Sequence, residues 1–147
     1  MTQREARVSF DMSTLSRHLN ANDPLALVIR AHLYVEAALT RKIESALVNQ
    51  SGFDSAKLPY PTKVKLAVGL GKIDARDVGG LIGLNGLRNR FAHDLDTQLN
   101  EQDERDLYNG FSTVQQRIAD SLREPDMVFM GKLRCDLIAI IVSAELQ

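Results

Sequence analysis

Three side chains that could act on a phosphodiester lie within six consecutive positions of this 147-residue chain. Arg88, Asn89 and His93 belong to the segment Leu-Arg-Asn-Arg-Phe-Ala-His-Asp at 87–94. A histidine can take up or release a proton near neutral pH, and an arginine can hold a phosphate through its planar fork of N–H donors. Together these groups are the minimum needed to cleave RNA without a metal ion.

The spacing of these residues decides which of them can act together. Arg88 and His93 lie roughly 140° apart on an ideal helix, so they do not share a face, whereas Asn89 and His93 at i and i+4 do. The side chain of Arg88 is long enough to reach the face that carries His93 if the helix ends near Ala92. A second chain would bring another arginine and histidine into the same groove, so the pattern predicts a site shared by two copies.

Each of these residues also has a purely structural interpretation. Basic side chains at a helix C-terminus are favoured by the macrodipole, which would account for Arg88 and His93. His32 lies near the apolar side of its helix, as a core histidine or a residue facing a partner would. Glu36 lies among apolar residues, where a structural ion pair with an arginine is expected. Cys135 is predicted to be a small core residue.

Four glycines precede the motif, at Gly79, Gly80, Gly83 and Gly86. Each costs about 1 kcal/mol of helix propensity relative to alanine. They therefore either break the segment into turns or allow another helix to approach closely. The apolar spacing continues through them, which favours the close approach, with a symmetric partner chain as a natural neighbour. They lack the preceding strand that a phosphate-binding loop needs.

Apolar residues recur at helical spacing along most of the chain, and strand-like alternation is nearly absent. Asp23 and Pro24 mark one helix start as cap and first-turn residue, and Asp74 marks another. The expected helical stretches are 9–20, 25–48, 62–70, the segment that carries Val78 to Leu87, 107–122 and 130–144, with a loop at 49–61. The fold class is therefore all-α, an antiparallel bundle of about five helices.

Two of these stretches have particular side chains that are expected to face the core. The clearest amphipathic pattern is that of 107–122, where the apolar side chains at spacings of three and four are Leu107, Phe111, Val114, Ile118 and Leu122. In the first stretch the inward side chains are expected to be Phe10, Leu15 and Leu19.

Composition and charge restrict the function classes. With 44% hydrophobic and 25% charged residues, the chain is predicted to form one helical domain over 1–147, with residues 1–8 as a flexible tail. A net charge of −1 argues against a large sequence-independent DNA-binding surface, which needs a basic excess. It still allows a local phosphate site built from Arg88 and Arg90.

No motif for metal or cofactor chemistry is visible. The sequence has no catalytic triad pattern, phosphate-binding loop, dinucleotide glycine pattern or cluster of metal ligands, so no cofactor and no metal is expected. A single cysteine cannot form an internal disulfide. The chain starts without a signal-type apolar run and has no segment near the roughly 20 apolar residues of a membrane span. These features predict a cytoplasmic protein that does not bind a membrane.

The order Arg88-Asn89-x-x-x-His93 resembles the Rx4–6H motif of the HEPN superfamily, in which a polar residue follows the arginine. The resemblance implies an all-α bundle that dimerises and pairs its motifs at the dimer interface. Many such proteins are metal-independent endoribonucleases of toxin–antitoxin, abortive-infection or phage-defence systems, and others keep the fold without nuclease activity. On this resemblance Arg88, Asn89 and His93 are the candidate catalytic residues, and Arg90 and Asp94 are candidates for binding RNA phosphate.

Residues 62–94 are also similar to the mannitol operon repressor-like family. The shared features are a helix that ends in a Leu-Gly-x-Ile turn, here at 70–73, and a following helix that leads to an arginine- and histidine-containing end. This resemblance implies a non-enzymatic regulator of transcription that works through protein contacts. A third possibility is an interaction module of a defence or toxin–antitoxin system with an inactive motif. The expected partners are a second copy of the chain, RNA, and an antitoxin or other regulatory protein.

Overall fold

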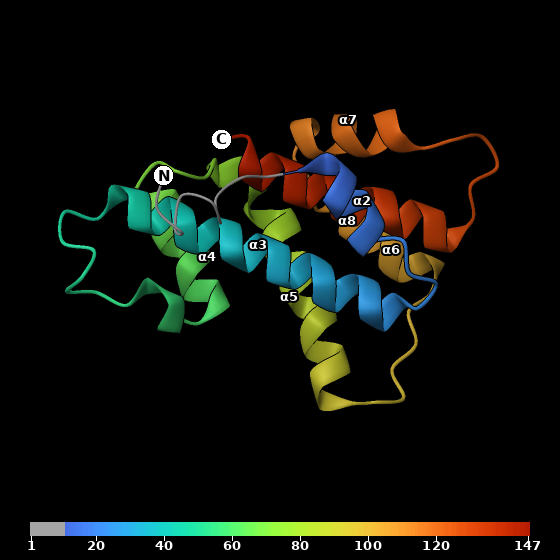
Figure 1. The fold of residues 1–147 in the computed structure, drawn as a ribbon. Coiled ribbons are helices and arrows are strands. Elements are labelled where there is room, and N and C mark those ends of the chain that lie inside the picture. Colours follow the sequence, from blue (N-terminus) through green and yellow to red (C-terminus); the bar gives the residue numbers. More distant parts are fainter. Residues whose placement is uncertain (1–10) are drawn as a thin grey trace.

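The computed structural model describes residues 11–147, and within that range the chain is helical with no strand (Figure 1). The α-helices are α2 (Met12–His18), α3 (Pro24–Ala46), α4 (Tyr60–Gly69), α5 (Val78–His93), α6 (Glu101–Asn109), α7 (Thr113–Leu122) and α8 (Phe129–Glu145). Short 3-10 turns, η1 (Ser55–Lys57) and η2 (Ala75–Asp77), lie in the loops before α4 and α5. The all-α prediction is confirmed, whereas seven α-helices in the described range exceed the expected five. The predicted tail at 1–8 and Phe10 lie outside the described residues.

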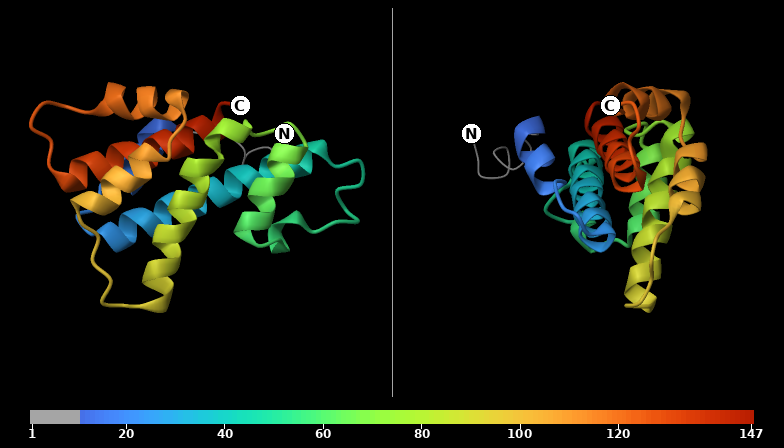
Figure 2. Two further views of the ribbon diagram at one scale, coloured as in Figure 1. Left: turned by 180° about the vertical axis from the view of Figure 1, so that it is seen from behind. Right: turned by 90° about the vertical axis from the view of Figure 1, so that its right-hand side faces the viewer.

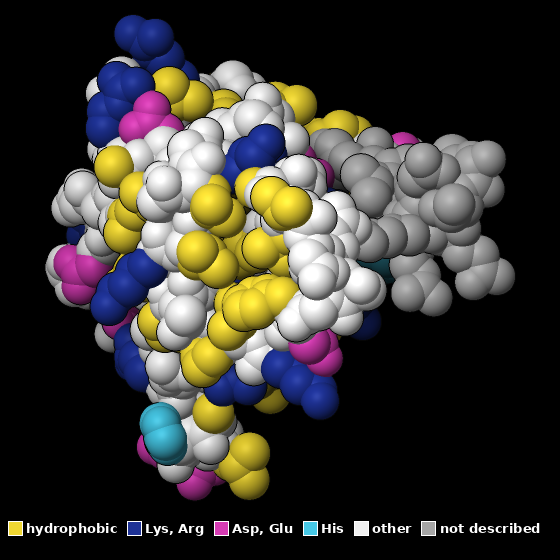
Figure 3. Space-filling model, turned by 90° about the vertical axis from the view of Figure 1, so that its left-hand side faces the viewer, with side chains coloured by type: hydrophobic (Ala, Val, Ile, Leu, Met, Phe, Trp, Pro, Cys, Tyr) yellow, Lys and Arg dark blue, Asp and Glu magenta, His cyan; other side chains and the backbone are white. Residues whose placement is uncertain are grey.

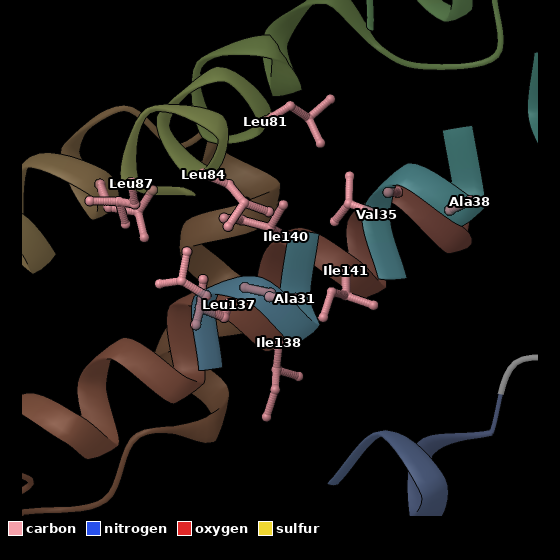
Figure 4. Packing of buried hydrophobic residues seen from close by; sticks show 14 of the residues in the cluster. Ala31, Val35, Ala38, Leu81, Leu84, Leu87, Leu137, Ile138, Ile140 and Ile141 are labelled. Atoms are coloured by element: carbon pink, nitrogen blue, oxygen red, sulfur yellow. The ribbon is translucent and has the colours of Figure 1, made fainter. Parts of the chain in front are cut away.

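Two long helices, α3 and α8, run side by side through the centre of the molecule (Figure 2). Helices α4 and α5 pack on α3, and helices α6 and α7 pack on α8. Figure 4 shows side chains from α3, α5 and α8 gathered in one cluster, among them Val35, Leu84 and Ile140. Fully burying a side chain of this kind stabilises the fold by about 1.5–3 kcal/mol. Among residues 11–147, no helix is both long enough and apolar enough to cross a membrane.

The two caps predicted from the sequence, Asp23 and Asp74, are both present. Asp23 accepts the backbone N–H of Leu25, and Pro24 is the first residue of α3, as predicted. Asp74 accepts the N–H of Arg76, so it caps η2, which leads directly into α5. The first expected helix is α2, and its predicted inward residues Leu15 and Leu19 are completely buried. The expected loop at 49–61 ends slightly early, because α4 already begins at Tyr60.

The prediction of one continuous helix over 107–122 is wrong. The chain breaks after Asn109 into α6 and α7, because Ser112 and Gln115 form a capping box that starts a new helix. Because of this break, α7 turns a different set of side chains toward the core than one continuous helix would. Val114 is 54% exposed, while Gln115 is fully buried in its place.

The glycines of α5 allow other helices to approach closely, as predicted, but within the same chain. A Cβ at Gly79 would clash with the carbonyl oxygen of Gly110, just after α6. A Cβ at Gly80 would meet Gln115 of α7, and one at Gly83 would lie 3.0 Å from Leu107 of α6. A Cβ at Gly86 would meet no atom within 4 Å. Three of the four glycines are therefore explained by contacts within the chain, and Gly86 is not.

Candidate functional site

Helix α5 carries the whole Arg-Asn-x-x-x-His motif, and its last turns project beyond the other helices (Figures 1 and 2). Phe91 is 6% exposed and Leu99 of the returning loop is 9% exposed, so apolar contacts anchor the projecting end. Arg90 donates to Asp103 of α6 at 2.7 Å. Thr97 in the loop donates to the carbonyl of Arg90 at 3.1 Å. The end of α5 is thus fixed in place although it protrudes.

One face of α5 is left uncovered. Ile82, Gly86, Asn89 and His93 follow one another at intervals of four, three and four residues, which places them on a single stripe of a helix. Ile82 is 42% exposed, Gly86 and His93 are exposed, and Asn89 is partly exposed. We call this line of four residues the α5 stripe. No other part of residues 11–147 covers Gly86 at the centre of this stripe.

The two side chains that the sequence predicts to be catalytic, Arg88 and His93, line different hollows. His93 lines an open hollow of about 590 Å³ together with Gly86, Arg90, Asp94 and the loop at 96–98. We call it the His93 hollow. Arg88 lines a pocket of about 330 Å³ between α3, α4 and α5, which we call the Arg88 pocket. Asn89 lines both. One chain therefore does not bring Arg88 and His93 into a common hollow.

Arg88, the candidate phosphate-binding group, is exposed and weakly engaged. Its guanidinium donates to Oδ1 of Asn89 at 3.4 Å, near the limit of a hydrogen bond. Arg90 and Asp94 are held more firmly, by Asp103 and by the backbone N–H of Asp96 respectively. A phosphate at Arg90 would compete with Asp103, whereas a phosphate at Arg88 would displace only a long amide contact.

Residues outside the motif complete the Arg88 pocket. His32 is 7% exposed, shares a hydrogen bond of 3.0 Å with Asn85, and stacks on Tyr60 with ring centroids 4.3 Å apart. Burial lowers the pKa of His32, and the positive charges of Arg88 and Lys63 act in the same direction. His32 is therefore a core histidine with a satisfied partner that also lines a pocket.

The expected ion pair of Glu36 is present, but its partner is a lysine. Lys63 of α4, only 2% exposed, lies with its ammonium 3.5 Å from the carboxylate of Glu36. The i and i+4 spacing of His32 and Glu36 predicts that they share a face of α3. The sequence gives no signal that α4 and α5 would supply Lys63 and Asn85 to that face. Cys135 is buried, as predicted.

Within the part of the chain that the structure describes, no group of three or more histidine, cysteine, aspartate and glutamate side chains is arranged to hold a metal ion. Comparison of the chain with protein-family models, curated proteins and solved structures gives no match. The resemblance to HEPN proteins therefore rests on the motif at 88–93, and that to mannitol operon repressor-like proteins on residues 62–94.

Proposed function

We propose that this chain is a HEPN-like, metal-independent endoribonuclease that acts as a homodimer, of the toxin or phage-defence type. The observation that supports the proposal is the α5 stripe. It leads from the apolar Ile82 across the uncovered Gly86 to Asn89 and His93. A second copy packed on the stripe would place its own motif next to this one.

The surroundings of the stripe suit contact with another copy of the chain. Figure 3 shows hydrophobic side chains gathered on the side of the molecule where α4 lies in Figure 1. Leu70, the residue directly after α4, is 38% exposed, and Ile82 of the neighbouring α5 is 42% exposed. A helix crossing at Gly86 could approach closely, because no side chain there holds it away. Symmetric dimers bury the same patch on both copies.

The dimer would supply the parts that one chain keeps apart. His93 of one copy would take the proton from a ribose 2′-hydroxyl, or give one to the leaving 5′-oxygen. Arg88 would stabilise the negative charge that builds up on the phosphate in the transition state. Asn89, which lines both hollows, would orient the phosphate between them. The 2′-oxygen forms a bond to phosphorus as the bond to the 5′-oxygen breaks, which gives a 2′,3′-cyclic phosphate and a 5′-hydroxyl.

The direct test is incubation of the purified chain with single-stranded RNA in excess EDTA. We expect cleavage that EDTA does not reduce, with product ends that carry a 2′,3′-cyclic phosphate, because the reacting groups are side chains. Mass spectrometry of the fragments identifies those ends. A stable dimer that cleaves no RNA would overturn the proposal and favour the regulator of the mannitol operon repressor-like type. Cleavage that EDTA abolishes would overturn the mechanism.

Replacing Gly86 with arginine should prevent dimerisation without unfolding the chain. A Cβ at this position meets no atom within 4 Å in its own chain, so the fold has room for a side chain there. A partner helix packed closely on Gly86 would leave no room for an arginine side chain. Light scattering coupled to size-exclusion chromatography would show a monomer, with the helical circular dichroism retained. The same variant should lose RNA cleavage.

The matched control is Gly86→Ala, which adds a single methyl group. Alanine should stabilise the monomer fold by about 0.5–1 kcal/mol, because it restores helix propensity. A Gly86→Arg chain that still forms dimers would place the interface elsewhere on the molecule.

A further inference from the structure

The Arg88 pocket has one apolar and one polar side, and the cleavage mechanism does not fully use it. It opens between α3, α4 and α5 and has a volume of about 330 Å³, which is at the lower end of the range for small-molecule sites. Ile29, Leu33 and Pro61 supply an apolar side. The other side is polar, and its side chains include Glu36, Asn85 and Arg88.

The charges around the pocket favour an anionic ligand. Arg88 is exposed, and within residues 11–147 its side chain makes one hydrogen bond, the 3.4 Å bond to Asn89. The positive charge of Lys63 is offset by Glu36 in their ion pair. One positive charge is therefore left for a ligand, on the side chain whose planar donors match a phosphate.

The pocket also offers groups that can recognise the edge of a base. Asn85 accepts from Nε2 of His32 through its Oδ1, so neutral His32 keeps a lone pair on Nδ1. That nitrogen makes no hydrogen bond within residues 11–147. The carboxylate of Glu36 is a second acceptor, 33% exposed at the side-chain level. Acceptors of this kind bind the N–H groups of a nucleobase.

We propose that the Arg88 pocket binds a single nucleotide, with the phosphate on Arg88 and Asn89 and the base between Leu33 and the Glu36 and His32 acceptors. The inference rests on the proposed function, because it takes the nucleotide to be one unit of the RNA substrate. A free mononucleotide has the same chemistry and would occupy the same site. Because Asn89 lines both hollows, a phosphate held there lies at the border with the His93 hollow.

The experiment measures binding of the four nucleoside monophosphates, of inorganic phosphate and of a short single-stranded RNA by calorimetry. Arg88→Gln should weaken mononucleotide binding about tenfold or more, because it removes a charge-assisted contact to phosphate. Leu33→Glu should weaken it similarly, because it places a negative charge at the pocket mouth on a side chain that is 59% exposed. An Arg105→Gln control on α6 should bind as the wild type does.

The outcomes separate this inference from the proposed function. Mononucleotide binding that is lost in Leu33→Glu but retained in His93→Ala supports the pocket, whether or not RNA is cleaved. If only the RNA binds, and Leu33→Glu weakens it, the ligand is a nucleotide within a chain. If inorganic phosphate binds as tightly as any mononucleotide, the base plays no part and the proposal is wrong. RNA cleavage and binding that Leu33→Glu leaves unchanged would also overturn it, while leaving the proposed function intact.

Discussion

Replacing His93 with alanine should slow RNA cleavage by about 10²- to 10⁴-fold, the usual contribution of a positioned general acid or base. The fold should be unaffected, because His93 is exposed, is the last residue of α5, and makes no side-chain hydrogen bond to residues 11–147. Initial cleavage rates and thermal melting of the same preparation would measure both effects. His18→Ala is the control, since it removes a histidine from α2, far along the chain from the motif.

A mixing experiment tests whether the site is shared between two chains. Co-expressed His93→Ala and Arg88→Ala chains would form heterodimers in which one site receives its arginine from one copy and its histidine from the other. With random pairing, about a quarter of the wild-type rate should return, because half of the dimers carry one intact site out of two. Each variant alone should stay inactive. Mixtures no more active than the single variants would contradict a shared site.

The sequence predicts well where the Arg-Asn-x-x-x-His motif lies in the fold, and poorly which residues pack around it. The motif falls at the end of α5 as expected, because caps, helical spacing and helix ends are local properties of the chain. The partners of His32 are not local, since Asn85 lies 53 residues away and is brought near only by the packing of α3 on α5. Spacing alone cannot encode that contact.

The break between α6 and α7 accounts for two differences between the sequence expectations and the structure. The continuous helix at 107–122 fails because the capping box of Ser112 outweighs a regular apolar pattern. The close neighbours of Gly79, Gly80 and Gly83 lie in the same chain, and the same break lets Gly110 approach Gly79. One turn between α6 and α7 therefore decides both the direction of α7 and the packing of α5. Gly86 alone keeps the original prediction of an intermolecular contact open.

Replacing Arg123 with leucine should destabilise the fold by about 3–5 kcal/mol, the usual cost of breaking a buried ion pair by removing one partner. Arg123 follows α7, and its Nη2 lies 2.9 Å from Glu104 of α6 and 2.7 Å from Asp136 of α8. Glu104 is 4% exposed and Asp136 is completely buried. The guanidinium also lies over the ring of Tyr108, 4.7 Å from its centroid. Leucine would leave two facing carboxyl groups without a cation.

Urea unfolding at pH 8 measures this loss, with Arg105→Leu as a matched control. Arg105 is also an arginine near an acidic partner, but its side chain is 55% exposed and its ion pair with Glu101 is 3.8 Å long. Exposed pairs of this kind contribute about 0–1 kcal/mol. A loss in Arg123→Leu no larger than in the control would show that the three-helix network does not stabilise the fold.

The network also predicts how stability depends on pH. Burial raises the pKa of Asp136 from 3.8 to about 8, and the neighbouring carboxyl group of Glu104 acts in the same direction. Its Oδ2 is buried without a partner among the described residues, and a proton on this carboxyl group would provide a donor for Glu104. Between about pH 4 and pH 8 the folded state therefore holds a proton that the unfolded state has released.

Folding stability should accordingly fall as the pH rises through that window and level off above it. Asp136→Asn cannot titrate, so its free energy of unfolding should change less between pH 5 and pH 8 than that of the wild type. Arg123→Leu should show the opposite change, a steeper decline, because the two carboxyl groups repel each other once both are ionised and no cation lies between them. Urea titrations of the three chains at pH 5 and pH 8 provide the comparison. Equal slopes in all three would mean that Asp136 is ionised in the folded state throughout the range.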